Sequence, residues 1–194
     1  MKLALFFMGI TLLYACSDKT GDTMETDPTI KTHLDTTKTV AESPDTIIAL
    51  KYYNNGNTKK KSNDFKGAIA DYSKAIEINP KYSQAYNNRG SAYGSLSDFK
   101  TALSDFNNAV KFDSLNVDAF FNRGLVKAKL NDVRGALKDF NRAIDLNPAA
   151  GNYYAKRGIA KSILGDKEGS CDDFRKGATA GNEESESYKK QFCK

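Results

Sequence analysis

Apolar and small residues between positions 49 and 184 recur with the spacing of amphipathic helices. In the stretch 83–96 they stand three or four residues apart, so they share one helical face, and the stretch 99–112 shows the same spacing. The polar pair Ser97-Asp98 interrupts the pattern between the two stretches. The sequence therefore predicts two antiparallel helices joined by a tight turn. Their apolar faces hold Tyr86, Gly90 and Tyr93 in the first helix and Ala102, Phe106 and Ala109 in the second.

This helix pair is expected four times, because the same residue types return every 34 positions. A fixed period of this length indicates stacked copies of one supersecondary unit. The predicted repeats are 49–82, 83–116, 117–150 and 151–184. The recurring columns are Gly56, Gly90, Gly124 and Gly158; Tyr52, Tyr86, Phe120 and Tyr154; Ala68, Ala102, Ala136 and Ser170; and Tyr72, Phe106, Phe140 and Phe174.

The aromatic column continues past the fourth repeat, because Tyr188 follows Tyr154 by one period. Phe192 stands where the next glycine belongs, so no partner helix is expected after it. We therefore predict a ninth helix over 184–193 that caps the last repeat. The expected fold is all-α, a solenoid of four helix pairs and a C-terminal capping helix.

These columns resemble the tetratricopeptide repeat, in which an aromatic, a Leu-Gly pair and a tyrosine mark the first helix, and Ala, an aromatic and Ala mark the second. The resemblance covers residues 49 to 184 and implies a right-handed α-solenoid whose first helices line a groove for a protein or peptide. Two columns depart from the family. Arg89, Arg123 and Arg157 replace the leucine, and Lys59, Lys127 and Lys161 replace the tyrosine.

The resemblance also implies which residues face the groove. An apolar pocket formed by the groove residues of the last two repeats would suit an apolar partner side chain, but neighbouring repeats could equally bury them. Some tetratricopeptide domains hold a C-terminal carboxylate with lysine, arginine and asparagine; here Asp118 and Asn122 stand where that clamp needs cations, so we expect none. The expected groove residues are Tyr53, Asn57, Gln84, Asn87, Asn88, Ser91, Phe121, Leu125, Lys129 and Ile159.

The arginine column is expected to pair with an aspartate column of the same period. Repeat one has Asn55 in place of arginine, so pairing within a repeat would leave Asp71 without a partner, whereas pairing with the preceding repeat gives every arginine an aspartate and needs no arginine in repeat one. We therefore predict ion pairs between repeats, with independent solvent contact as the alternative. The predicted pairs are Asp71–Arg89, Asp105–Arg123 and Asp139–Arg157, and Asp173 is expected to meet Gln191 of the cap.

The N-terminal part of the chain predicts export and anchoring. Residues 1–15 have the short positive and apolar regions of a signal peptide. Their end before Cys16 resembles a bacterial lipobox, which implies lipidation of Cys16; an ordinary signal peptide or a retained anchor are the alternatives. Residues 16–46 are expected to form a disordered tether rich in threonine and acids. We therefore expect a lipid-anchored envelope protein, in the outer membrane and facing the periplasm.

The charge is divided between these parts. Residues 17–46 carry seven acids and three bases, a net charge of −4, whereas residues 47–194 carry 25 bases and 17 acids, a net charge of +8. A positive repeat domain suits acidic partners, although a soluble helical surface also accounts for this charge. The export signal argues against nucleic acid as a partner.

Two cysteines remain in the predicted repeat domain. Cys171 lies near the start of the last second helix and Cys193 near the end of the cap. Antiparallel packing of these helices would bring the two thiols level, and an oxidising compartment would let them form a disulfide. The alternative is two unpaired thiols, with Cys171 acting as a small apolar residue.

Covalent chemistry is not expected. The only histidine, His33, lies in the tether, so no Ser-His-Asp or Cys-His arrangement can form in the repeats. No phosphate-binding glycine loop, metal site or cofactor site is recognisable. We therefore expect a non-enzymatic binding scaffold, or alternatively a structural envelope component that assembles with copies of itself.

Overall fold

The computed structural model describes residues 43–193 of the chain. The predicted signal peptide, Cys16 and most of the predicted tether lie outside the described residues. Every element within 43–193 is a helix. The elements are α1 (Pro44–Lys61), α2 (Phe65–Ile78), α3 (Ser83–Ser95), α4 (Phe99–Phe112), α5 (Val117–Lys129), α6 (Val133–Leu146), α7 (Gly151–Ile163), α8 (Lys167–Thr179) and α9 (Glu183–Phe192).

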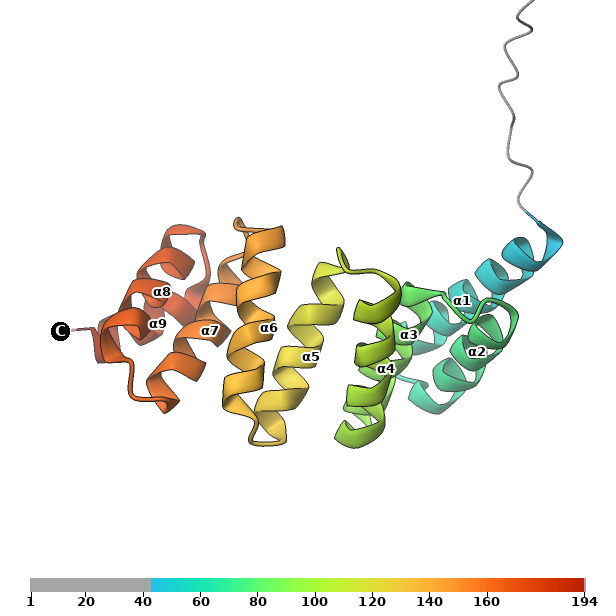
Figure 1. Ribbon diagram of the computed structural model, residues 1–194, viewed down its shortest axis with the longest axis horizontal. Helices are drawn as coiled ribbons and strands as arrows, with labels where there is room; N and C mark the ends of the chain where they lie inside the picture. Colours follow the sequence, from blue (N-terminus) through green and yellow to red (C-terminus); the bar gives the residue numbers. More distant parts are fainter. Residues whose placement is uncertain (1–42, 194) are drawn as a thin grey trace, which may run out of the picture. The chain divides into compact units, whose positions relative to one another are not determined.

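The helices pack as four consecutive pairs, and each pair stacks on the next (Figure 1). The odd-numbered helices also contact one another, α1 with α3, α3 with α5 and α5 with α7. Helix α9 packs on α8 and contacts α7, so it covers the end of the last pair as predicted. The predicted all-α solenoid is confirmed. Helix α1 begins at Pro44, three residues before the expected start of the domain.

Each pair turns at a residue with a left-handed backbone, followed by an aspartate that caps the second helix. The carboxylate of this aspartate accepts a hydrogen bond from the backbone N–H three residues later, over 2.9 to 3.1 Å. The break at Ser97-Asp98 therefore recurs in every repeat. The left-handed residues are Asn63, Ser97, Asn131 and Gly165, with φ of 62°, 62°, 66° and 86°, and the caps are Asp64, Asp98, Asp132 and Asp166.

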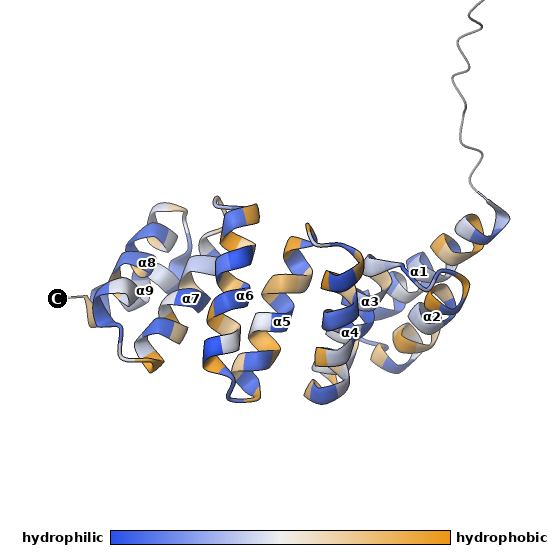
Figure 2. Ribbon diagram, in the orientation of Figure 1, coloured by the Kyte–Doolittle hydropathy of each residue, from blue (hydrophilic) through white to orange (hydrophobic). Residues whose placement is uncertain are grey.

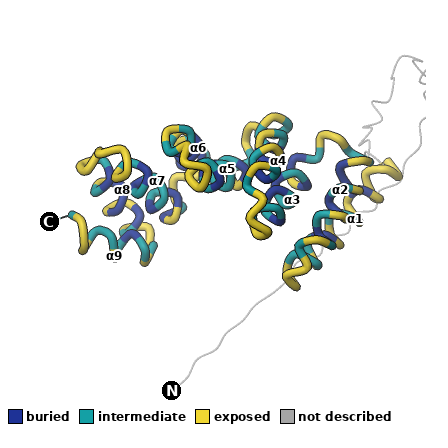
Figure 3. The backbone as a smooth tube through the Cα atoms, turned by 90° about the horizontal axis from the view of Figure 1, so that it is seen from below, coloured by how far each residue is buried: buried dark blue, intermediate teal, exposed yellow. Residues whose placement is uncertain are grey.

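The glycine columns permit close contact between the two helices of a pair. A Cβ atom on Gly124 would lie 2.7 Å from Cε1 of Phe140, whose ring is buried. Apolar residues are interspersed with polar ones along the helices (Figure 2), and the buried residues lie where neighbouring helices face each other (Figure 3). The core is therefore a row of small clusters: one joins α2 to α3, one joins α4 to α5, and two join α6 to α7.

The ion pairs run within the repeats, so the prediction that they run between repeats is wrong. Each arginine donates two hydrogen bonds, over 2.6 to 2.9 Å, to the aspartate of its own second helix. Only its third nitrogen reaches back to the preceding repeat, where it donates to a neutral side chain. The pairs are Arg89–Asp105, Arg123–Asp139 and Arg157–Asp173, and the neutral acceptors are Ser73, Asn107 and Asn141.

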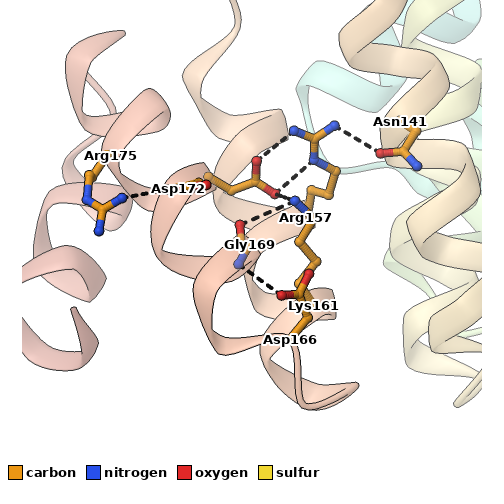
Figure 4. Close-up of polar contacts among 8 residues, drawn as sticks. Asn141, Arg157, Lys161, Asp166, Gly169, Asp172 and Arg175 are labelled. Carbon is orange, nitrogen blue, oxygen red and sulfur yellow. Dashed lines mark hydrogen bonds and ion pairs between the residues drawn. The ribbon is translucent and has the colours of Figure 1, made fainter.

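The lysines that replace the family tyrosine complete this network. Lys161 lies 2.9 Å from the buried carboxylate of Asp173, which Arg157 also binds. Figure 4 shows Arg157 reaching Asn141 on its other side. Asp173 thus has two cations and does not depend on the cap helix, contrary to the expected contact with Gln191. In repeat one, where arginine is absent, Lys59 alone pairs with the aspartate and lies 2.7 Å from Asp71. Every buried aspartate of this column therefore has at least one cation, since an unpaired buried charge is costly.

The last repeat and the cap are joined covalently. Cys171 and Cys193 form a disulfide, with their Cα atoms 5.5 Å apart and 22 positions apart in sequence. The ring of Tyr188 on α9 packs against Phe174 of α8, with centroids 5.1 Å apart. The cap is therefore held by a disulfide at its end and by an aromatic contact along its length.

Candidate functional site

The odd-numbered helices together form one surface, called here the groove face. At its N-terminal end, hydrogen bonds join side chains of α1, α2 and α3. Asn57 accepts from the hydroxyl of Tyr72 over 2.7 Å and from the amide of Asn88 over 2.8 Å. The same Asn88 amide donates to the hydroxyl of Tyr53 over 3.1 Å. The Tyr72 hydroxyl is protonated at neutral pH, and burial raises its pKa further.

This network continues along the groove face into the third repeat. Asn122 on α5 donates to Asn87 over 3.1 Å, and Asn87 donates to Asn88 over 3.3 Å. Lys60 on α1 donates to the Asn88 carbonyl over 3.4 Å. Four of the expected groove residues therefore belong to one chain of amide and hydroxyl groups: Tyr53, Asn57, Asn87 and Asn88.

Phe121 packs into the core and does not line an open pocket. Its ring lies 4.6 Å from that of Tyr153 and 5.8 Å from that of Phe140, measured between centroids. It is half-buried and belongs to the clusters around Ala136 and Ala143. Neighbouring helices therefore cover part of the Phe121 ring, and its contact with a partner stays a prediction.

The remaining predicted apolar residues line small cavities. Leu125 lines a cavity of about 260 Å³ together with Ser91 and Lys129, so three predicted groove residues meet there. Leu125 and Ile159 line a second cavity of about 70 Å³, and Ile159 lines a third of about 170 Å³ beneath the cap helix. Gln84 is exposed and lines none of these three.

Two residues that shape this face were not predicted from the sequence. Lys60 and Gly94 occupy the same place in successive repeats, followed by Ala128 and Ser162 in the next two. Lys60 joins the amide network, and Gly94 leaves open space where a side chain would stand. The sequence signal that could have revealed Lys60 and Gly94 is the variation within this column. Columns that keep one residue type hold core positions, whereas columns that vary hold surface positions.

The described residues show no arrangement for metal chemistry. No group of three or more His, Cys, Asp or Glu side chains within 43–193 could hold a metal ion. None of the helices in this range is long and apolar enough to cross a membrane. The polar groups of the groove face include amides, hydroxyls and lysines, together with the carboxylate of Asp118, and all of these can hydrogen-bond to a ligand.

The repeats match known family models. A model of the TPR repeat matches residues 56–97, and a model of the tetratricopeptide repeat matches residues 89–155. The chain contains tetratricopeptide repeats. Both models describe repeats of this type, and neither describes an enzyme. No curated protein sequence matches the chain.

Several solved structures share the fold. The first TPR of Spaghetti (RPAP3), bound to the HSP90 peptide SRMEEVD, is 28% identical, with a TM-score of 0.61, and the match covers 62% of this chain and 95% of that one. The Arabidopsis OM64 TPR domain is 25% identical, with a TM-score of 0.60, over 61% of this chain and 98% of that one. A MamA protein is 19% identical over 75% of this chain and 86% of that one, with a TM-score of 0.65, which shows the fold alone.

Proposed function

We propose that this protein is a non-enzymatic scaffold that binds a protein or peptide on its groove face, while a lipid on Cys16 anchors it in the bacterial envelope. The observation that carries the binding role is the chain of amide and hydroxyl groups from Tyr53 to Asn122 beside a row of apolar cavities. Amides that both donate and accept can pair with the backbone of an extended peptide.

A similar protein supports this role. The first TPR of Spaghetti is bound to a peptide, SRMEEVD, in its solved structure. The carboxylate clamp that some relatives use is not proposed here. Asp118 is an exposed acid on α5, and the amide of Asn122 is engaged with Asn87. We expect recognition along the length of the peptide instead.

Site-specific crosslinking in intact cells tests the binding role. A photoreactive residue at Lys129, which is exposed at the rim of the largest of the three groove-face cavities, should capture a defined partner. The same residue at Lys138, which is exposed on α6, is the matched control and should capture little of it. Identical products from both positions, or none from Lys129, would contradict binding on the groove face.

The anchoring role rests on the sequence around Cys16, which lies outside the described residues. We propose lipidation there and a location in the outer membrane, facing the periplasm. Metabolic labelling with a fatty-acid probe should mark the wild type and leave Cys16→Ser unmarked. Labelling of both proteins, or of neither, would contradict the anchor.

A second candidate function is assembly with copies of the same chain. Large apolar residues are exposed at both ends of the described solenoid: Ile47 is 55% exposed on α1, and Ile163 and Phe192 are 65% and 59% exposed near the cap. Apolar surface at opposite ends could join successive copies head to tail. Light scattering over a range of concentrations tests this, and a monomer at the highest concentration contradicts it.

A further inference from the structure

The three cavities of the groove face follow the 34-residue period. The first lies between α3 and α5, the second between α5 and α7, and the third between α7 and α9. Leu125 lines both the first and the second, and Ile159 lines both the second and the third. Each cavity is lined by one aromatic residue of the same repeat column, Phe106, Phe140 or Phe174 in turn. The groove face therefore carries one apolar cavity at each of these interfaces.

The cavities differ in size, and the sequence explains part of the difference. The first, of about 260 Å³, is lined by Gly94, where a Cβ would meet no atom within 4 Å. Ala128 occupies the same place in the second, which holds only about 70 Å³, and Ile163 also narrows it. Ser162 stands in the third, of about 170 Å³. The row thus offers a large, a small and an intermediate cavity in order toward the cap.

A lysine begins the row. Lys60 stands one period before Gly94 and points its ammonium at Asn88. Burial lowers the pKa of Lys60, although the negative charge of Asp118 partly opposes this. Neither Lys60 nor Lys129 takes part in any ion pair among residues 43–193. Lys60 is half-buried and forms no ion pair among the described residues, so its ammonium favours an acidic group of a ligand.

The spacing of the cavities selects the conformation of a peptide. Packed helices lie about 8–10 Å apart, so adjacent cavities are separated by about this distance along the row. A polyproline II chain rises about 3.1 Å per residue and completes a turn in three residues, which brings every third side chain to the same face after about 9.3 Å. In a β-strand, side chains two residues apart are separated by only about 6.8 Å, which is too short to reach from one cavity to the next. A helical ligand has no free backbone groups in its interior for the asparagine amides.

We infer that the groove face binds an extended peptide with side chains of defined type at every third position: an acid at Lys60, a large apolar residue at Gly94, a small residue at Ala128 and a medium apolar residue beneath the cap. This inference rests on the proposed binding function and adds the class of ligand. The Asn57 amide nitrogen and the Asn122 carbonyl oxygen make no hydrogen bond within residues 43–193, so they can hold the backbone of the peptide while the cavities bind its side chains.

Designed peptides test the register on the full chain with its disulfide formed. One probe carries Glu, Phe, Ala and Leu at every third position, separated by Ser and Gln, and is made in both chain directions. Two comparison probes carry the same four residues at every second or at every seventh position. A third comparison probe keeps the every-third spacing but exchanges Phe and Ala. Fluorescence anisotropy should show that the every-third probe binds at least about tenfold more tightly than each comparison, because displaced apolar side chains stay in water.

Two variants of the protein complete the test. Gly94→Leu fills the largest cavity of the row from within and should weaken the every-third probe at least about tenfold, while the open space there lets the helix remain folded. Ala70→Leu, at an exposed site on α2, is the matched control and should bind as the wild type does. Circular dichroism checks that both variants keep their helices.

Several results would overturn the inference: equal binding of all spacings, tightest binding of the every-seventh probe, no binding of any probe, or no effect of Gly94→Leu. The crosslinking experiment at Lys129 depends on none of these peptides. If a partner is captured at Lys129 but the peptides give any of these results, binding on the groove face still holds and only the every-third pattern of the ligand is disproved.

Discussion

A double-mutant cycle on Asp105 separates ion pairing within a repeat from ion pairing between repeats. Arg89 donates to Asp105 through two hydrogen bonds of 2.9 and 2.8 Å, and their side chains are 20% and 4% exposed. Arg123 occupies the same column in the next repeat but pairs with Asp139. The cycle therefore compares the couple Arg89 and Asp105 with the couple Arg123 and Asp105.

The expected magnitude follows from burial. Removing one partner of a buried ion pair costs about 3–5 kcal/mol of unfolding free energy. Because Arg89 is partly in water and keeps Ser73 as an acceptor, we expect about 2–3 kcal/mol for Asp105→Ala alone. Arg89→Leu leaves the buried Asp105 carboxylate without a cation, so we expect about 3–5 kcal/mol for that variant. The double variant should lose less than the sum of the two, which leaves a coupling energy of about 2 kcal/mol. Arg123→Leu and Asp105→Ala should add to within about 0.5 kcal/mol.

Urea unfolding followed by circular dichroism measures all five variants and the wild type. The two couples share Asp105→Ala, so any general weakening of the second repeat enters both cycles equally. A coupling energy near zero for Arg89 and Asp105 would refute the reasoning. So would a larger coupling for Arg123 and Asp105, which is the pair expected from the sequence.

Three further changes test the packing. Gly124→Ala should lower the unfolding free energy by about 1–3 kcal/mol in urea, because its Cβ would lie 2.7 Å from the ring of Phe140; an unchanged midpoint would contradict the close contact. Gly94→Ala should instead raise it by up to about 1 kcal/mol, since alanine favours a helix and the site is open. Replacing both Cys171 and Cys193 by serine should cost about 3 kcal/mol on the chain-entropy model. Limited proteolysis should then cut first near the cap, and cleavage elsewhere first would argue against local fraying.

The sequence by itself determined the helices and their order. Each helix could be predicted because its signals are local: the 34-residue period, the Ser97-Asp98 type of turn and the small and aromatic columns all act within one helix pair. The cap was predictable for the same reason, since Tyr188 continues one column and Phe192 ends another. The binding role followed from the resemblance to the tetratricopeptide repeat.

Only the tertiary structure decided which residues of equal period meet. Arg89 lies between Asp71 and Asp105 in sequence at nearly equal distances, so periodicity could not choose between them. The packing of α3 on its own partner α4 made the choice. The expected pairing failed because it assumed that Asp71 needs arginine, whereas Lys59 neutralises it.

The same limit applies to the groove face. The sequence placed Phe121, Leu125 and Ile159 on one face, but only the packing of adjacent repeats covered part of the first and left cavities beside the other two. A cavity depends on side chains from three or more helices, and also on positions such as Gly94 where no side chain fills the space. Local patterns fix which face a residue takes, and the volume left between faces exists only once the repeats are stacked.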